Sequence, residues 1–349
     1  MIKNILLLST MCSILFGVKA ERDKSDFSKD HTIILKGMAA IAILFHHLAL
    51  QYGGNLFFRF LTTIGHLPTA LFFFISGYGL NCKCTYYEKN IMLWRKSISK
   101  IVKPFLAAAV IYAIFYKLYL QVAWKQIFVD FFTGELVKYS WFVWELLIWY
   151  ILFLVLQYIV KNEKVRAVIL FVLAFCMTFA FWFIRANFVW YDICFMFPLG
   201  NMCAMLYSRE CTKKKYGNAV FAPAGFTKLA LGYVLEIWKW NVLEASAYGR
   251  GILLIFTNIS AAGFCMLIFA FCTSFKMKSA LWTKIGQNSY YIYLYQGLCF
   301  VLINRLIPDS GDDTKIVLEL ILLFGIIALI NAVVHARRKF TGEQYERKN

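Results

Sequence analysis

Two adjacent histidines, His46 and His47, end an apolar run that begins at Lys36 and Gly37. An imidazole titrates near neutral pH, so it can accept a proton from a reacting hydroxyl group. If the run is helical, Lys36 lies about 16 Å from His47 along the axis, at about 1.5 Å per residue. A single histidine in an apolar segment is usually a structural hydrogen-bonding residue, but an adjacent pair favours a role in chemistry.

A basic stretch, residues 94–104, carries Arg95, Lys96, Lys100 and Lys103 just before another apolar segment. Clustered cations suit phosphate groups, with lysine acting as a point charge and arginine as a two-pronged donor. The same charges also keep a loop on the cytoplasmic side of a membrane. The sequence leaves both explanations open.

A Ser-Gly-Tyr-Gly motif, residues 76–79, follows three phenylalanines in the apolar segment near residues 60–81. Its Ser76 and Tyr78 can offer hydroxyl groups to a ligand. The small residues Gly77 and Gly79 can instead let two helices approach closely. The motif is not Gly-x-Ser-x-Gly, so no hydrolase nucleophile is predicted here.

Later apolar segments contain further polar side chains, and each needs a compensating partner inside a membrane. Glu145 and Asp192 can orient a histidine or bind a sugar hydroxyl, or they can pair with another charged or backbone group. Tyr293 and Gln296 lie one helical turn apart in an unusually polar and aromatic segment, so they share a face. The cysteines show no Cys-x-x-Cys spacing, and no metal site is predicted.

The composition of the whole chain identifies what positions these groups. It has 349 residues, of which 61% are hydrophobic and 16% charged. Soluble domains average about 45–50% apolar and about 25% charged, so an ordinary cytosolic enzyme, a disordered chain and a small disulfide-stapled domain are excluded. The net charge of +18 fits basic cytoplasmic loops better than nucleic-acid binding. The predicted fold is therefore all-α, a polytopic transmembrane helical bundle of about ten spans surrounded by membrane lipid.

Apolar windows of about 20 residues place the ten spans. They lie near 35–52, 60–81, 102–120, 141–160, 165–184, 187–207, 219–238, 251–272, 285–306 and 316–335. The connections after every second span, with the C-terminal tail, carry 22 Lys and Arg residues against 9 in the alternating connections. This asymmetry predicts a multi-pass protein of the cell membrane with a cytoplasmic C-terminus.

Three segments are expected along the chain. Residues 1–20 resemble a signal peptide, with Lys3, an apolar stretch and a Val-Lys-Ala ending. A cleaved signal would invert the orientation that the loop charges predict, so we expect an extra, uncleaved apolar helix. Residues 24–340 form the transmembrane domain, and residues 341–349 form a cytoplasmic tail.

Taken together, five motifs resemble the acyltransferase-3 family of integral membrane O-acyltransferases. They are Lys36-Gly37 with His46-His47, residues 72–78, the basic stretch ending at Pro104, Trp141-Phe142, and Ser289 with residues 292–294. The resemblance spans residues 24–335. It implies a helical membrane enzyme that moves an acyl group, often acetyl, from cytoplasmic acyl-coenzyme A to a carbohydrate hydroxyl. The expected partners are acyl-coenzyme A, as co-substrate, and a carbohydrate acceptor, with no tightly bound cofactor.

The resemblance also implies roles for single residues. The family's catalytic histidine falls on His47, with His46 as the alternative. Two departures from the family pattern stand out: its paired arginines fall on Ser97 and Lys100, and a histidine common in its ninth-span motif is Gln296 here. The expected acyl-coenzyme A contacts are Lys36, Arg95, Lys96, Lys100 and Lys103. The expected substrate or oxyanion contacts are Ser76, Tyr78, Trp141, Glu145, Asp192, Ser289, Tyr293 and Gln296.

On this hypothesis neutral His47 removes the acceptor proton as the hydroxyl attacks the thioester. The basic stretch holds the coenzyme-A phosphates, and the thioester threads inward toward the histidine. An acyl-histidine intermediate is a variant of the same scheme, and transfer of succinyl or a longer acyl group stays open. Two other classes also remain: a polysaccharide exporter or transporter with a proton relay, and a scaffold whose polar residues only join helices.

Overall fold

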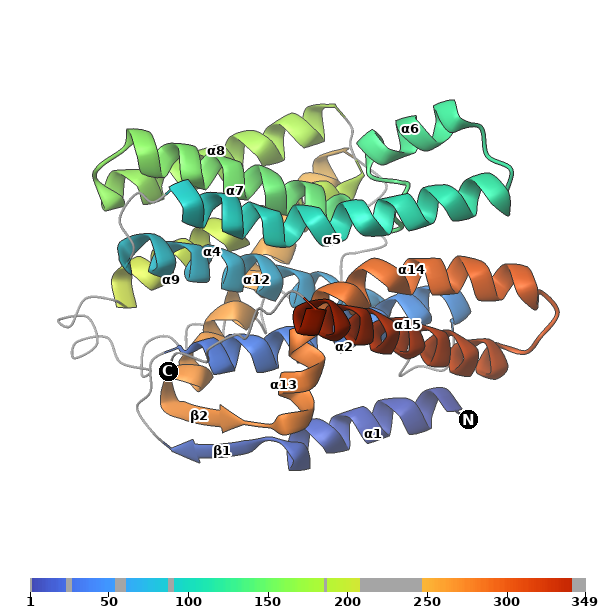
Figure 1. Cartoon of the computed structure of the whole chain (residues 1–349). Helices are drawn as coiled ribbons and strands as arrows, with labels where there is room; N and C mark the ends of the chain where they lie inside the picture. Colours follow the sequence, from blue (N-terminus) through green and yellow to red (C-terminus); the bar gives the residue numbers. More distant parts are fainter. Residues whose placement is uncertain are drawn as a thin grey trace.

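The computed structural model describes residues 2–22, 27–53, 61–86, 91–184, 187–207 and 247–340. Most of these residues are helical, and most helix axes run roughly parallel (Figure 1). The connections therefore gather at two ends of the bundle. We call the end that holds the two short strands the sheet end, and the end that holds residues 119–140 and 187–195 the loop end.

The elements have the following bounds. The helices are α1 Ile2–Gly17, α2 Lys29–Tyr52, α4 His66–Tyr86, α5 Ile91–Leu118, α6 Trp124–Thr133, α7 Trp141–Ile159, α8 Glu163–Phe183, α9 Met196–Tyr207, α12 Ala247–Ser274, α13 Ala280–Gln287, α14 Ser289–Leu306 and α15 Asp312–Phe340. A 3₁₀ turn, η1, covers Phe188–Trp190, and the strands are β1 Lys19–Arg22 and β2 Phe275–Lys278.

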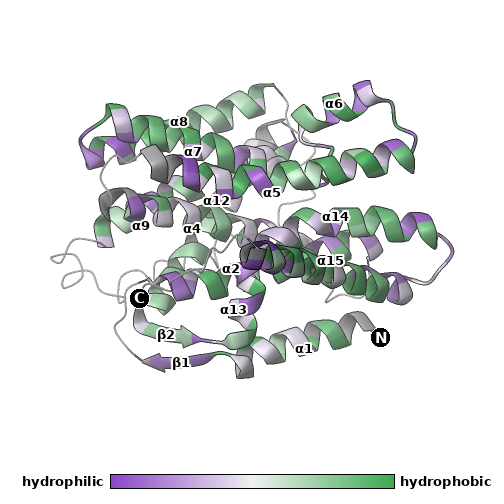
Figure 2. Cartoon of the chain, in the orientation of Figure 1, coloured by the Kyte–Doolittle hydropathy of each residue, from purple (hydrophilic) through white to green (hydrophobic). Residues whose placement is uncertain are grey.

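Six of the described helices are long and apolar enough to cross a membrane. They contain the segments Lys29–Tyr52, Arg95–Leu118, Trp141–Ile159, Glu163–Phe183, Gly251–Ser274 and Asp312–Arg337. Hydrophobic residues cover most of α5, α7, α8 and α15, while hydrophilic residues gather near the connections (Figure 2). Many large apolar side chains on these helices are exposed, as lipid-facing residues would be. The chain is therefore a helical integral membrane protein, and the total of about ten spans stays a prediction.

Three details of the expected secondary structure differ. The expected span 187–207 is helical only as the 12-residue α9, because the preceding residues form the loop and η1, where Asn187 Oδ1 accepts from the Val189 N–H at 3.4 Å. The expected span 285–306 is broken at Asn288 into α13 and α14. The bundle is also not purely α-helical, because β1 and β2 form an antiparallel pair. The expected span 219–238 lies outside the described residues.

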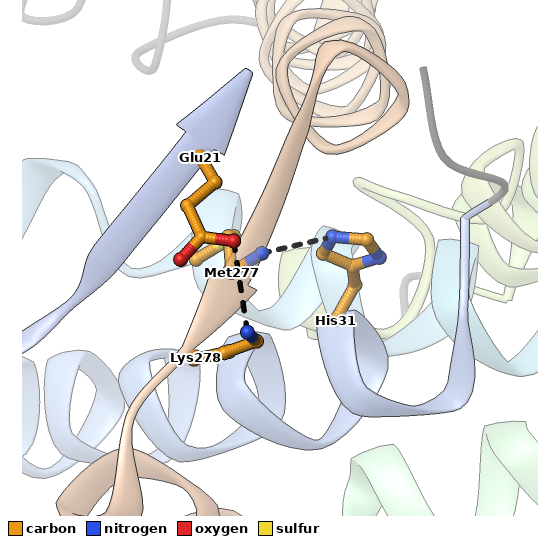
Figure 3. A network of polar contacts seen from close by, with 4 residues as sticks. All are labelled: Glu21, His31, Met277 and Lys278. Atoms are coloured by element: carbon orange, nitrogen blue, oxygen red, sulfur yellow. Dashed lines mark hydrogen bonds and ion pairs between the residues drawn. The ribbon is translucent and has the colours of Figure 1, made fainter. Parts of the chain in front are cut away.

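His31 joins the start of α2 to this small sheet (Figure 3). Its Nδ1 accepts a hydrogen bond from the Ser28 N–H at 3.1 Å, and this bond caps the start of α2. Its Nε2 lies 2.9 Å from the Phe275 carbonyl oxygen. The same Nε2 lies 3.3 Å from the Met277 backbone nitrogen. Because the ring is only 1% exposed, it acts as a buried joint between segments 244 residues apart.

Helices α4 and α9 pack closely through small residues. A Cβ added to Gly77 would overlap the Phe197 carbonyl oxygen, and one added to Gly200 would overlap the Phe74 carbonyl oxygen. Gly77 is therefore a point of close helix approach, as one interpretation of its motif predicts. Gly79 has no atom within 4 Å of an added Cβ, so that interpretation is wrong for it.

Candidate active site

A cavity of about 350 Å³ lies beside His47, near the end of α2. Its walls come from α2, the start of α4, residues 134–141, residues 187–193 and Tyr293 of α14. Apart from Tyr293, these segments meet at the loop end of the bundle (Figure 1). None of the lining residues belongs to the basic stretch, which lies at the sheet end.

His47 is held in the wall of this cavity. Its side chain is 7% exposed, and its ring stacks on Tyr139 with 3.7 Å between ring centres and 8° between planes. Gln296 lies beside the imidazole. His47 Nδ1 and Gln296 Oε1 are both buried with no hydrogen-bond partner in the described part of the chain. Such buried atoms without a partner are uncommon in folded proteins, and each calls for an explanation.

His46 faces the protein backbone instead. Its Nδ1 lies 2.8 Å from the Leu61 carbonyl oxygen, and its ring packs so closely on Gly65 that an added Cβ there would overlap it. The two histidine rings are 5.3 Å apart. Since Nδ1 is engaged and the rest of the ring rests on Gly65, His46 is better placed to support the cavity wall than to transfer protons.

Four predicted site residues gather around His47. Trp141, Asp192 and Tyr293 line the cavity, and Gln296 lies beside the imidazole. Tyr293 donates its hydroxyl proton to the Tyr139 carbonyl oxygen, so it fixes the residue on which the His47 ring stacks. Asp192 is 7% exposed and supplies a carboxylate to the cavity wall.

The structure does not bring the other predicted polar residues to this cavity. Ser76 contacts Tyr150, and Tyr78 packs in an aromatic cluster with Phe27, 4.8 Å between ring centres. Ser289 begins α14 and is buried.

Glu145 is fully buried in α7 and lies outside the cavity lining. Its Oε1 accepts from Trp149 Nε1 at 3.3 Å and from Cys194 Sγ at 3.4 Å. Its Oε2 has no hydrogen-bond partner among the described residues. These contacts hold α7 against the segment before α9, so Glu145 joins helices at this place.

The predicted acyl-coenzyme A contacts lie together at the sheet end. Arg95, Lys96, Lys100 and Lys103 are exposed on the first turns of α5. Lys36 lies within electrostatic range of Lys100 and of Lys83 at the end of α4. These six cations thus share one end of the bundle. Along α2, about 16 Å separates Lys36 from His47.

Sequence reasoning missed three residues that line the cavity. His66 Nε2 lies 3.2 Å from Ser260 Oγ, and the ammonium of Lys138 lies 5.4 Å from the centre of the Tyr139 ring. Burial lowers the pKa of Lys138 below its ordinary value, opposed by the nearby Glu319 charge, and burial raises the pKa of Tyr139 to about 12. The sequence signal at this place is the Lys138-Tyr139 pair, which Ser140 separates from Trp141.

Three histidines line this cavity, yet no metal centre is evident. Among the described residues, His, Cys, Asp and Glu side chains form no group of three that could hold a metal ion. The arrangement instead offers one unpartnered imidazole nitrogen, the carboxyl groups of Glu135 and Asp192, and the Lys138 cation around a space of small-molecule size. It can bind a polyhydroxyl compound and move a proton.

Comparison with protein families gives a match that covers most of the chain. A family model described as an acyltransferase domain matches residues 33–335, which contain both histidines and every segment of the cavity wall. No curated protein and no solved structure matches the chain significantly.

Proposed function

The chain belongs to the acyltransferase-3 family, and we propose that it is a membrane O-acyltransferase that moves an acyl group, most simply acetyl, from cytoplasmic acyl-coenzyme A to a carbohydrate hydroxyl. The acceptor belongs to a cell-surface or lipid-linked carbohydrate, and the protein lies in the cell membrane. The observation that carries the proposal is the buried His47 ring, with an unpartnered Nδ1 in the described part of the chain, in the wall of a cavity.

His47 acts as the general base in this proposal. A neutral imidazole has one N–H and one nitrogen lone pair, and the lone pair takes the acceptor proton as the oxygen attacks the thioester carbon. Tyr139 fixes the plane of the ring by stacking, and Gln296 lies where its amide can fix the tautomer. His47 then returns the proton to the leaving thiolate, so the enzyme ends in its starting state.

The negative charge that develops on the thioester oxygen needs a donor. Lys138 is the cation of the cavity wall, and Trp141 brings an indole N–H to the same wall. Tyr293 is less suited, because its hydroxyl proton is engaged by the Tyr139 carbonyl oxygen. We assign oxyanion stabilisation to Lys138 and Trp141, and carbohydrate hydroxyl binding to Asp192.

The two substrates approach from different ends in this scheme. The cations Lys36, Arg95, Lys96, Lys100 and Lys103 bind the phosphates of coenzyme A at the sheet end, which the loop charges predict to be cytoplasmic. The cavity walls come mainly from the loop end, where the carbohydrate enters. The thioester reaches His47 along α2, which carries both Lys36 and the base.

The test is acyl transfer by purified protein in lipid nanodiscs. Coenzyme-A release is followed with a thiol reagent, and acylated oligosaccharide by mass spectrometry. We expect His47→Ala to lose transfer by at least a hundredfold while it purifies and unfolds like the parent protein. His335→Ala, which changes an exposed histidine at the end of α15, is the matched control and should keep full activity.

Two results would overturn the proposal. Full activity of His47→Ala would remove the histidine from the chemistry. Absence of thioester consumption by the parent protein, with carbohydrate transport across the same membrane, would favour the exporter alternative instead.

A further inference from the structure

A second cavity, of about 570 Å³, adjoins the cavity of His47 at the loop end. The two cavities share Leu50, Lys138 and Tyr139 as lining residues, so a single layer of side chains separates them. The far wall comes from the last turns of α2 and α14, which pack side by side (Figure 1). A ligand can therefore extend from one cavity toward the other.

Two amide side chains of this second cavity are fixed in orientation. Gln51 Nε2 donates to the Tyr52 hydroxyl at 3.2 Å, and Asn304 Nδ2 donates to the same hydroxyl at 3.1 Å. Asn304 Nδ2 also donates to the Phe300 carbonyl oxygen at 2.9 Å, and Tyr52 passes its own proton to Glu319. Both N–H groups of Asn304 and one of Gln51 are engaged, which leaves the two amide oxygens to accept hydrogen bonds from hydroxyl groups.

Two cations line the same cavity. Lys138 comes from the connection before α7, and Arg305 from the last turn of α14. In the described ranges neither forms an ion pair with a carboxylate, and the ion pair found there is Lys278 with Glu21 at the sheet end. Lys138 lies within electrostatic range of Glu319, whereas Arg305 is exposed and can bind an anion as a two-pronged donor.

The geometry points to a binding subsite for an acidic sugar unit of the acceptor carbohydrate, beside the unit that is acylated at His47. This inference rests on the proposed function and adds the substrate class. The amide oxygens of Gln51 and Asn304 accept from sugar hydroxyls, and the ring of Tyr139 offers an aromatic face. Arg305 binds the carboxylate of a uronic acid, or a phosphate in the same position, while Lys138 stays with the thioester oxygen.

The experiment measures equilibrium binding, so it does not depend on catalysis. The probes are a neutral oligosaccharide, the same oligosaccharide with one glucuronic acid, and a version with a sugar phosphate in its place. The protein is the full chain in nanodiscs of uncharged lipid. We expect the acidic oligosaccharide to bind about tenfold more tightly than the neutral one, as one charge-assisted hydrogen bond gives.

The variant Arg305→Gln should remove most of that tenfold preference. Lys125→Gln is the matched control, because Lys125 is an exposed cation of α6 at the same end of the bundle and lines neither cavity. It should keep the preference. The relative affinities of the glucuronic acid and the sugar phosphate then tell which anion the subsite prefers.

The inference is overturned if neutral and acidic oligosaccharides bind equally, or if Arg305→Gln and Lys125→Gln reduce binding alike. It is also overturned if adding anionic lipid to the nanodiscs abolishes oligosaccharide binding through Arg305, because the cavity would then hold a lipid headgroup. Failure of the proposed function has a different signature: selective binding of the acidic sugar without coenzyme-A release.

Discussion

Tyr139 offers the sharpest test of how the cavity holds its histidine. Its ring lies parallel to the His47 ring at 3.7 Å, and its carbonyl oxygen accepts the Tyr293 hydroxyl. Its φ of +71° is in the left-handed region, which residues other than glycine rarely adopt. The ring therefore acts on the histidine, while the backbone at the same position is strained.

Three substitutions separate these two effects. Stacked aromatic pairs contribute about 0.5–1.5 kcal/mol, so Tyr139→Ala should lower kcat about twofold to tenfold by releasing the His47 ring. Tyr139→Phe keeps the ring and should stay within about twofold of the parent. Tyr139→Gly also lacks the ring, but it relieves about 1–2 kcal/mol of strain in the left-handed backbone conformation. The opposing cost is about 0.5–1 kcal/mol, because glycine loses more chain entropy on folding than alanine does.

The assays are coenzyme-A release at saturating substrates and thermal unfolding in nanodiscs. Tyr139→Gly and Tyr139→Ala should lose activity equally, yet the glycine variant should unfold at the higher temperature. If Tyr139→Ala keeps the parent kcat, stacking does not position His47 and the reasoning fails. If Tyr139→Phe loses as much as Tyr139→Ala, the phenol oxygen matters rather than the ring.

Three further outcomes follow from packing. Gly65→Ala should displace the His46 ring and lower stability by about 1–3 kcal/mol, measured by thermal unfolding, and an unchanged midpoint would contradict the close contact. Gly77→Ala should destabilise by a similar amount because it separates α4 from α9, whereas Gly79→Ala should be neutral or slightly stabilising in the same assay. His31→Ala should loosen the sheet end and speed hydrogen exchange of the β2 amides, and parental exchange rates would show that the ring does not hold the strands.

Most of the helical architecture follows from the apolar pattern. Windows of apolar residues locate α2, α5, α7, α8, α12 and α15, because a membrane span leaves a long uniform signal. The segment 187–195 was expected inside a span, because loops that cover a buried cavity are also apolar. The pairing of β1 with β2 has no local signal, since it joins residues more than 250 positions apart.

The candidate site was predictable only in part. Residue type singles out the His46-His47 pair, the family resemblance assigns the base to His47, and helical periodicity places Tyr293 and Gln296 on one face. Lys138 and Tyr139 lie in a connection, and their approach to His47 depends on how that connection folds over α2, which periodicity does not encode. Glu145 has a chemically suggestive residue type, but its contacts are with Trp149 and Cys194.

The site also bears on whether the acyl group ever resides on the histidine. His47 Nδ1 is buried, with no hydrogen-bond partner among the described residues. General-base catalysis needs one acceptor oxygen within hydrogen-bond distance of the ring, whereas an acyl group bonded to the ring needs space for several heavy atoms beside it. We therefore predict direct transfer to the acceptor, with no acyl-histidine intermediate. In rapid-quench experiments without acceptor, acyl-coenzyme A should release much less than one equivalent of thiol per protein. A burst of one equivalent, with the acyl group found on His47 by mass spectrometry, would show instead that the ring turns its other nitrogen to the thioester and acts as a nucleophile.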